Sequence, residues 1–222
     1  MFRELLSRRQ VLGMILGVSV LAVAGSGRPL EAQTPLKQTP DQILGPFYPV
    51  AKPPAHSADL VKLPGRPGPA EGQVLHVMGR VLTRQGKPIE GARVEIWQAN
   101  KYGRYTHPSD PNPAPLDPNF EGYGVQVTDA EGRYHFRTIK PGAYPTGPNS
   151  MRPPHIHFEV TGRVVRLVTQ MYFAGEPLND TDRFLQSAGA GKERLIVSLK
   201  PGGPDLEPES LVAVWDIVLV GD

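Results

Sequence analysis

The sequence predicts an all-β protein folded as an antiparallel β-sandwich, with long active-site loops and an extended N-terminal arm. Short runs of alternating or β-branched residues recur along the chain, turn sequences such as RQGKPIEG and DAEG separate them, and no long stretch carries a helical period. Some eight strands with this spacing favour a sandwich. We expect strands at 74–82, 92–98, 124–129, 133–139, 155–161, 167–173, 194–199 and 211–220.

Turn chemistry supports the boundaries of these runs in chain order. The runs at 74–82 and 92–98 flank RQGKPIEG, in which glycine and proline predict a turn. The runs at 124–129 and 133–139 flank DAEG, a second turn sequence. One exception to the β pattern is DTDRFLQSAG, where we expect a turn or two of helix.

The segment that precedes the first strand is interpreted as an extended arm. Residues 25–72 are rich in proline and poor in periodicity, which is typical of a linker or an arm wrapped over a core. A chain of 222 residues, 39% of them hydrophobic, is long enough for one well-buried domain. We therefore expect a single β-sandwich domain at residues 73–222.

Composition excludes several classes of function. Beyond residue 24 the basic and acidic side chains are equal in number, so no electrostatic argument favours a nucleic acid as partner. The chain has no cysteine, which excludes disulfides, thiolate-bound zinc and cysteine-bound iron-sulfur clusters. Any bound metal must therefore be held chiefly by nitrogen and oxygen atoms.

Residues 1–24 resemble a twin-arginine export signal. Arg8 and Arg9 directly precede a run of apolar and small residues, and Ala22 to Ala24 form an A-x-A cleavage site. An uncleaved membrane anchor is the alternative, but the run is shorter than the ~20 residues that span a bilayer. We expect a periplasmic or extracellular protein with no stable membrane span after cleavage.

The segment RPPHIHFEV and two nearby loops hold the candidate ligands. Successive strand residues point to opposite faces, so His155 and His157 share one face with their Cβ atoms about 7 Å apart, a spacing that one metal ion can bridge. Tyr105 and Tyr144 lie in long irregular loops, where binding groups are often mounted. Taken singly, a tyrosine is more commonly a ring packed on the core with its hydroxyl hydrogen-bonded.

Seven blocks in order carry a resemblance to a known family. Together they resemble the intradiol ring-cleavage dioxygenases, and within that family the iron-bearing beta subunits of protocatechuate 3,4-dioxygenases. The blocks cover most of the chain that follows the predicted signal. They are TPDQILGPFYP (39–49), GKPIEGARVEIWQANKYGRYTH (86–107), APLDPNFEGYG (114–124), YHFRTIKPGAYP (134–145), RPPHIHF (152–158), LVTQMYF (167–173) and WDIVLVG (215–221).

The resemblance implies a mononuclear non-haem Fe(III) centre. Matched residue by residue, its ligands are Tyr105, Tyr144, His155 and His157. Phenolate oxygens are hard anionic donors that suit ferric iron, and two of them with two neutral imidazoles differ from the two-histidine, one-carboxylate set of ferrous oxygenases. Such a centre activates the organic substrate rather than O₂ directly.

The resemblance also implies the reaction and the residues that serve it. A small aromatic diol of the catechol type reacts with O₂ and is cleaved between its two hydroxyl-bearing carbons, giving a cis,cis-muconate-type diacid. Tyr144 is expected to leave the metal and act as a base, while Tyr105 remains bound. Arg152 is expected to stabilise negative charge on the ring, and Gln170 matches an amide close to the site.

The resemblance is compatible with more than one substrate and more than one assembly. Tyr48, Thr146 and Arg152 are expected to bind the substrate, although Tyr48 has simple packing as an equal alternative. Thr146 stands where the protocatechuate enzymes have a tryptophan, so a protocatechuate-like acid or another substituted catechol would both be compatible. The resemblance implies either a homo-oligomer or a homologous second subunit that completes the pocket.

Two other functions were weighed against the dioxygenase. An exported β-sandwich binding module without catalysis would be expected to have a damaged ligand set, whereas all four ligand positions and Arg152 are intact. A zinc-dependent hydrolase would be expected to place a carboxylate or another water-activating base near the metal. Two tyrosines at the ligand positions have no obvious use for zinc.

Overall fold

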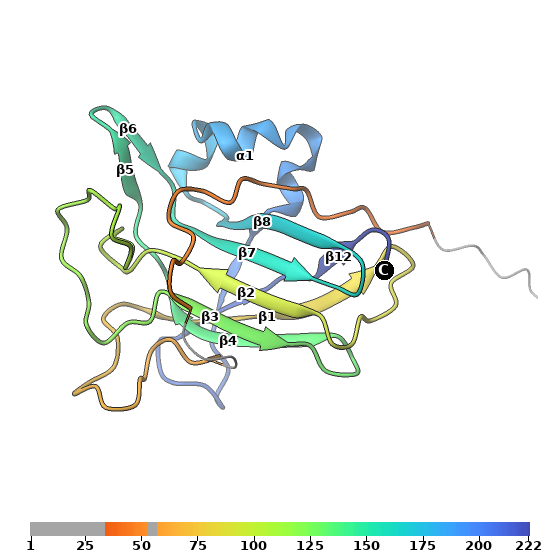
Figure 1. Cartoon of the computed structure of the whole chain (residues 1–222), viewed down its shortest axis with the longest axis horizontal. Helices are drawn as coiled ribbons and strands as arrows, with labels where there is room; N and C mark the ends of the chain where they lie inside the picture. Colours follow the sequence, from red (N-terminus) through yellow and green to blue (C-terminus); the bar gives the residue numbers. More distant parts are fainter. Residues whose placement is uncertain (1–33, 53–56) are drawn as a thin grey trace, which may run out of the picture. The chain divides into compact units, whose positions relative to one another are not determined.

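Two β-sheets pack face to face in the structure, a computed structural model that describes residues 34–52 and 57–222 (Figure 1). The predicted export signal lies outside the described residues, as does part of the predicted arm. Among the helices of the described residues, none is long and apolar enough to cross a membrane. The all-β prediction is confirmed.

The first sheet is built around the long strand β1. Its order is β10-β11-β1-β12, and β4 also pairs with β1. Its strands are β1 (Val74–Thr83), β4 (Arg133–Ile139), β10 (Leu199–Pro201), β11 (Leu211–Val214) and β12 (Ile217–Leu219).

The second sheet carries the His-x-His segment on a central strand. Its order is β3-β2-β7-β8-β9. Its strands are β2 (Arg93–Trp97), β3 (Tyr123–Val127), β7 (His155–Thr161), β8 (Arg166–Phe173) and β9 (Ile196–Val197). A separate hairpin and a short helical segment complete the described chain: β5 (Tyr144–Gly147), β6 (Ser150–Arg152), η1 (Pro177–Asp180), α1 (Arg183–Ser187) and η2 (Gly189–Arg194). The α1 helix confirms the helical turn expected there.

The predicted sandwich is mainly antiparallel, with three parallel strand pairs among the residues that the structure describes. Strand β1 pairs antiparallel with β4 but parallel with both β11 and β12, and β8 pairs parallel with β9. Alternation predicts a strand but not its partner or its direction, and such pairs join residues far apart in the chain, for example Leu75 with Leu211. The other five strand pairs of the described residues are all antiparallel.

The run expected at 211–220 is interrupted between β11 and β12. The N–H of Trp215 donates to the carbonyl of Met78 (2.8 Å), and Asp216 accepts from the N–H of Arg80 (2.9 Å). A Cβ at Gly79 would collide with the carbonyl oxygen of Trp215, so glycine permits this close approach. The run expected at 194–199 is similarly divided among the end of η2, β9 and β10.

The hydrophobic core lies between the two sheets. Val77 of β1 and Phe136 of β4 meet Ile96, Phe158 and Met171 of the second sheet, and all five side chains are fully buried. Alternate residues of each strand face this core, as the period-2 pattern requires.

The described part of the arm covers the outer face of the second sheet. Gln42 donates its backbone N–H to Val168 of β8 (2.8 Å), and Thr169 donates its hydroxyl to the carbonyl of Pro40 (2.8 Å). The side-chain amide of Gln170 donates to the carbonyl of Ile43 (2.8 Å). Because the core covers one face and the arm the other, every residue of β7 except the last is buried.

Candidate active site

Strand alternation on β7 places the two histidines on the arm-facing side of the second sheet. Ile156 and Phe158 belong to the core, so His155 and His157 point the other way. In the strand register His157 lies opposite Trp97 of β2, and the two rings stack at 4.9 Å with an interplanar angle of 11°. His155 lies opposite Tyr172 of β8, and these rings stack at 5.5 Å. Each imidazole is thus oriented by an aromatic ring on a neighbouring strand.

The N-terminal arm packs against the ring of His157. Gly45 has a φ of 77° and lies so close to His157 that a Cβ there would be 3.0 Å from the Cε1 of the imidazole. Only glycine adopts this conformation without strain and leaves room for the ring. The segment ILGPFYP therefore packs directly onto the site.

Tyr105 comes from the long loop between β2 and β3. The side-chain oxygen of Asn100 accepts hydrogen bonds from the N–H groups of Tyr102 and Arg104, and the carboxylate of Asp110 accepts from the N–H of Tyr105 (2.7 Å). Such side-chain to backbone bonds hold irregular loops in one conformation. They explain how a loop residue becomes only 3% exposed.

Tyr144 begins the β5–β6 hairpin, where the sequence predicted only a loop. In this hairpin Tyr144 lies directly opposite Arg152, and the Nη1 of Arg152 donates to the Tyr144 hydroxyl at 3.4 Å. Proline and glycine in this segment hide a strand from pattern-based prediction. The hairpin nevertheless brings together two residues that are eight positions apart.

The four predicted ligands form a closed ring of neighbours. Ring centroids are 5.4 Å apart for Tyr105 and Tyr144, 5.5 Å for Tyr144 and His155, 4.9 Å for His155 and His157, and 6.2 Å for His157 and Tyr105. The Nε2 atoms of the two histidines lie 3.3 Å apart. All four side chains are buried, so the structure brings together the whole predicted set.

Hydrogen bonding fixes the tautomer of His155. Its Nδ1 lies 2.7 Å from the carbonyl oxygen of Pro153, which can only accept, so Nδ1 carries the proton and Nε2 offers a lone pair. Burial, together with the positive charge of Arg152, holds the pKa of His155 well below its usual range. Burial and the neighbouring His155 lower the pKa of His157 in the same way. Neutral imidazoles are the form that binds metals.

The two tyrosines are uncharged phenols unless a cation binds. Burial raises the pKa of Tyr105 well above its usual value, and burial also raises that of Tyr144, against the opposing effect of Arg152. The hydroxyl of Tyr105 is buried without a hydrogen-bond partner in the described structure, which is costly unless something else satisfies it.

This donor set fits a hard metal ion. No three His, Cys, Asp or Glu side chains of the described residues are grouped to hold a metal, so a centre here needs the phenol oxygens. A trivalent cation would bind them as phenolates, release their protons and satisfy the Tyr105 oxygen.

Arg152 is the most extensively bonded side chain beside this ring. Its Nε donates to Asp182 (2.8 Å), and its Nη2 donates to the side-chain oxygen of Gln170 and to the hydroxyl of Tyr172, both at 2.8 Å. Its Nη1 lies 3.0 Å from Nε2 of His155. Burial opposes the charge, but Asp182 and the two tyrosines it contacts raise the pKa of Arg152, which therefore stays cationic.

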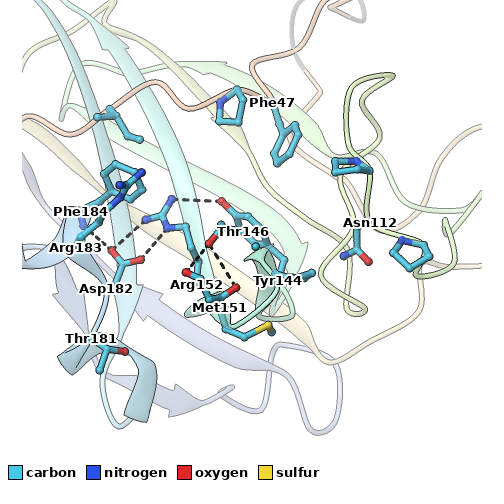
Figure 2. Close-up of a pocket in the computed structure, with 17 residues that line it drawn as sticks. Phe47, Asn112, Tyr144, Thr146, Met151, Arg152, Thr181, Asp182, Arg183 and Phe184 are labelled. Carbon is cyan, nitrogen blue, oxygen red and sulfur yellow. Dashed lines mark hydrogen bonds and ion pairs between the residues drawn. The ribbon is translucent and has the colours of Figure 1, made fainter.

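A cavity of about 660 Å³ opens beside Tyr144 and Arg152 (Figure 2). Its size lies in the ~300–1,000 Å³ range of small-molecule sites. It is lined by the arm, the Tyr105 loop, the β5–β6 hairpin and the start of α1. The lining residues include Ile43, Phe47, Asn112, Tyr144, Thr146, Met151, Arg152, Asp182, Arg183 and Phe184.

Three other predicted residues occupy different places. Thr146 lines the cavity and its hydroxyl lies 2.8 Å from that of Ser150 across the hairpin. Gln170 lies outside the cavity lining and joins Arg152 to the arm, as its bonds to Arg152 and Ile43 show. Tyr48 also lies outside the lining, which corrects its expected substrate contact. Its ring packs edge-on against Trp97 at 5.0 Å and its hydroxyl donates to Glu95 (3.2 Å).

Sequence reasoning missed three residues at the site. Phe47 rather than Tyr48 lines the cavity, and its ring lies 4.7 Å from that of Tyr105. Alternation in the extended arm could have suggested that adjacent aromatic residues point to opposite sides. Tyr172 shares the face of Gln170 at period two. Asp182 lies near the start of the segment expected to be helical and directly precedes α1, a position where an acidic cap is common. Neither signal reveals the bond to Arg152.

The chain belongs to the intradiol dioxygenase family. Residues 43–221 match the family model described as Dioxygenase. The family uses non-haem iron, and this chain is a protocatechuate 3,4-dioxygenase-like intradiol ring-cleavage enzyme.

Individual relatives agree with this assignment. The chain is 45% identical over 198 residues to the protocatechuate 3,4-dioxygenase beta chain of Burkholderia cepacia, which covers 87% of this chain and 84% of that protein. It is similar to the solved dioxygenase domain of a dioxygenase and carbohydrate-binding fusion from Streptomyces sp. SirexAA-E, with a TM-score of 0.63 and 31% identity over 83% of this chain and 99% of that one. Catechol 1,2-dioxygenase from Pseudomonas arvilla C-1 gives a TM-score of 0.65 at 29% identity, with 82% of this chain spanning 62% of that enzyme.

Proposed function

We propose that this chain is a ferric dioxygenase that binds its iron through Tyr105, Tyr144, His155 and His157 and cleaves a catechol between its two hydroxyl-bearing carbons. The observation that carries the proposal is the closed ring of two buried phenols and two neutral imidazoles beside a cavity that Tyr144 and Arg152 line. The product would be a cis,cis-muconate-type diacid.

The proposed roles follow from where each side chain lies. Ferric iron, when bound, would withdraw charge from a chelated catecholate and open its ring to O₂. Tyr144 lies both in the ligand ring and on the cavity, so as an iron-bound phenolate it could take a proton from an incoming diol. Tyr105 lies outside the cavity-lining set and would remain a permanent ligand. Arg152 is a fixed cation at the cavity wall and would stabilise negative charge on the ring.

The zinc hydrolase is less well supported by this geometry. That function needs a carboxylate free to activate water. Among the described residues the carboxylate at the cavity wall is Asp182, whose oxygens bond to Arg152 and to the backbone N–H groups of Phe184 and Leu185. A carboxylate held in this way is not available as a base.

The test combines metal analysis with visible absorption of the purified protein. Tyrosinate-to-iron charge transfer should colour the resting protein red, and anaerobic addition of a catechol should shift the band. Admission of O₂ should then yield the ring-opened diacid, identified by mass spectrometry. A protein that holds no iron after reconstitution and responds to no catechol would instead favour a binding module.

We further propose that the chain is exported by the twin-arginine route as a folded protein. Arg8, Arg9 and the A-x-A sequence at Ala22 to Ala24 support this proposal. Cell fractionation with N-terminal sequencing tests it, and replacement of both arginines by lysine should retain the protein in the cytoplasm. Secretion that is unaffected by the double substitution would contradict it.

A similar protein suggests that this chain assembles with other subunits. A relative named as a beta chain supports a homo-oligomer or a homologous second subunit here. Light scattering of the purified protein, alone and after co-expression with candidate homologous chains, measures the assembly directly. A monomer with full activity would contradict both forms.

A further inference from the structure

The cavity wall carries one positive charge that no neighbour neutralises. Its charged lining side chains are Arg152, Asp182 and Arg183. The first two form an ion pair with each other. Arg183 is exposed, and within residues 34–52 and 57–222 it has no ion pair and no side-chain hydrogen bond. The cavity therefore has a net positive charge at Arg183.

Arg183 is held close to the reacting end of the cavity by an aromatic ring. The guanidinium carbons of Arg152 and Arg183 each lie 4.6 Å from the ring centre of Phe184, so they are at most twice that distance apart. Figure 2 shows Arg183 and Phe184 beside Arg152, on the side of the cavity away from Asn112. Stacking on an aromatic face limits the freedom of the Arg183 side chain.

The other polar lining groups are already bonded. The side-chain amide of Asn112 donates to the carbonyl of Gly103 (2.8 Å), and its oxygen accepts from the N–H of Ala114. The hydroxyl of Thr146 contacts that of Ser150. Arg183 is thus the polar lining group best able to select a substituent on the substrate.

The cavity is also larger than the reacting diol requires. A bare catechol is a single six-membered ring with two oxygens, whereas about 660 Å³ lies in the range of sites that bind larger ligands. Beyond Tyr144 the walls are largely apolar and include Ile43, Phe47, Met151 and Phe184. This lining suits an apolar spacer between the diol and a charged group.

The geometry points to a substrate class: a catechol whose carboxylate is separated from the ring by a short side chain, with Arg183 binding the carboxylate. This inference rests on the proposed function, because it assumes that the diol is held at Tyr144 and Arg152. The side chain would lie along Phe184, and a guanidinium can bind the two carboxylate oxygens together.

The first test uses the iron-loaded full chain and a graded set of substrates. The set contains catechol, a catechol with its carboxylate on the ring, catechols with the carboxylate on one-, two- and three-carbon side chains, and the methyl ester of each acid. The acids with side chains should exceed their esters in kcat/KM by about tenfold, the effect of one charge-assisted hydrogen bond. That ratio should fall as ionic strength rises.

The second test removes the charge. Arg183→Gln should lower the acid-to-ester ratio about tenfold, through KM rather than kcat, because a remote contact binds substrate and transition state alike. Arg163→Gln is the matched control. Arg163 is also exposed, but it lies in the turn between β7 and β8 at the far end of these strands, so its replacement should leave the ratio unchanged. Anaerobic dissociation constants for each acid and ester give the same comparison without turnover.

The outcomes separate this inference from the function on which it rests. A ratio near one in the wild-type protein, a ratio that Arg183→Gln does not change, or a maximum at the ring-carboxylate acid would overturn the substrate class alone. If no member of the set, catechol included, binds or is cleaved, the proposed function fails and the substrate class fails with it.

Discussion

Arg152 and Asp182 form an ion pair inside the protein, with Nε and Oδ2 2.8 Å apart and side chains only 5% and 2% exposed. Asp182 also caps α1 by accepting from the N–H groups of Phe184 and Leu185. One carboxylate therefore fixes both the charge beside the ligand ring and the helix that carries Arg183.

Removal of this carboxylate should be strongly destabilising. In Asp182→Asn the side-chain oxygen can still cap α1, but the buried charge of Arg152 loses its partner. We expect a loss of about 3–5 kcal/mol in the free energy of unfolding, measured by urea denaturation. Glu131→Gln, at an exposed pair with Arg133, is the control and should cost less than ~1 kcal/mol. Equal losses in the two variants would show that the buried Arg152–Asp182 pair stabilises the protein no more than an exposed ion pair does.

Arg152→Lys tests whether the positive charge at the cavity wall must be held in place by the guanidinium contacts. Lysine keeps the positive charge but cannot reproduce the donor set that contacts Asp182, Gln170 and Tyr172. Turnover of a catechol should fall by ~10²-fold or more, while iron content is unchanged. Metal analysis and steady-state kinetics on the same preparation measure both. Full activity in this variant would show that a positive charge suffices there and that the guanidinium contacts are not required.

Tyr105→Phe should weaken iron retention and shift the visible charge-transfer band, because one phenolate donor is lost. Tyr134→Phe is the matched control, since Tyr134 is also 3% exposed but donates its hydroxyl to the carbonyl of Trp215. The control should lose about 1 kcal/mol of stability and keep its colour. Absorption spectra and iron analysis during dialysis against a chelator compare the two. Identical spectra would argue against Tyr105 as a ligand.

The adjacent aromatic residues of the arm should behave differently. Phe47→Ala removes a wall of the cavity and should raise KM for a catechol several-fold, as loss of a buried ring contact predicts. Tyr48→Phe removes only the hydroxyl that bonds Glu95, so it should cost about 1 kcal/mol in stability with KM unchanged. Steady-state kinetics and urea unfolding distinguish the two effects. A KM change confined to Tyr48→Phe would restore the substrate contact first expected for Tyr48.

The loop before β11 should loosen in acid. Burial works against ionisation of Glu207, but hydrogen bonds from its own N–H, His76 and Arg137 outweigh burial and lower its pKa to about 2, from an ordinary 4.5. A lowered folded-state pKa stabilises the protein above about pH 4.5, and this stabilisation is lost as the pH falls towards about 2.

Unfolding midpoints between neutral pH and about pH 3 measure this contribution. Glu207→Gln should be less stable at neutral pH and should show a weaker dependence on acid than the wild-type protein. Asp205→Asn, in the same exposed loop, is the control and should follow the wild-type curve. If the unfolding midpoints of Glu207→Gln and of the wild type depend on pH in the same way, Glu207 is not the group that makes the protein less stable in acid.

The sequence predicted those parts of the fold that depend on local pattern. Strands β4 and β7 have the bounds expected from alternation, because each has a core-facing side and is bounded by turn residues. The β5–β6 hairpin was not predicted, since YPTG contains proline and glycine, and SMR is too short to show apolar alternation. The break at Trp215 depends on its contact with Gly79, more than a hundred residues earlier, which no local window contains.

In the candidate site, too, local pattern predicted some features, whereas others depend on tertiary contacts. The alternation rule alone placed His155 and His157 on one face, whereas the convergence of Tyr105 and Tyr144 on them was implied by the family resemblance and depends on loop conformation. The bond between Asp182 and Arg152 joins α1 to β6 through tertiary packing. Nothing in the spacing of these residues distinguishes Asp182 from an ordinary helix cap.

The parallel pairing of β1 with both β11 and β12 has a consequence for biosynthesis. Leu75 pairs with Leu211 and Val81 with Ile217, so one edge of β1 remains open until residues 211–219 have left the ribosome. Contacts over such long sequence separations form slowly, and an open edge can recruit other chains in the meantime. We therefore expect the pairing of β11 and β12 with β1 to be a late step of folding, and a nascent chain stalled before residue 211 to be a target for chaperones.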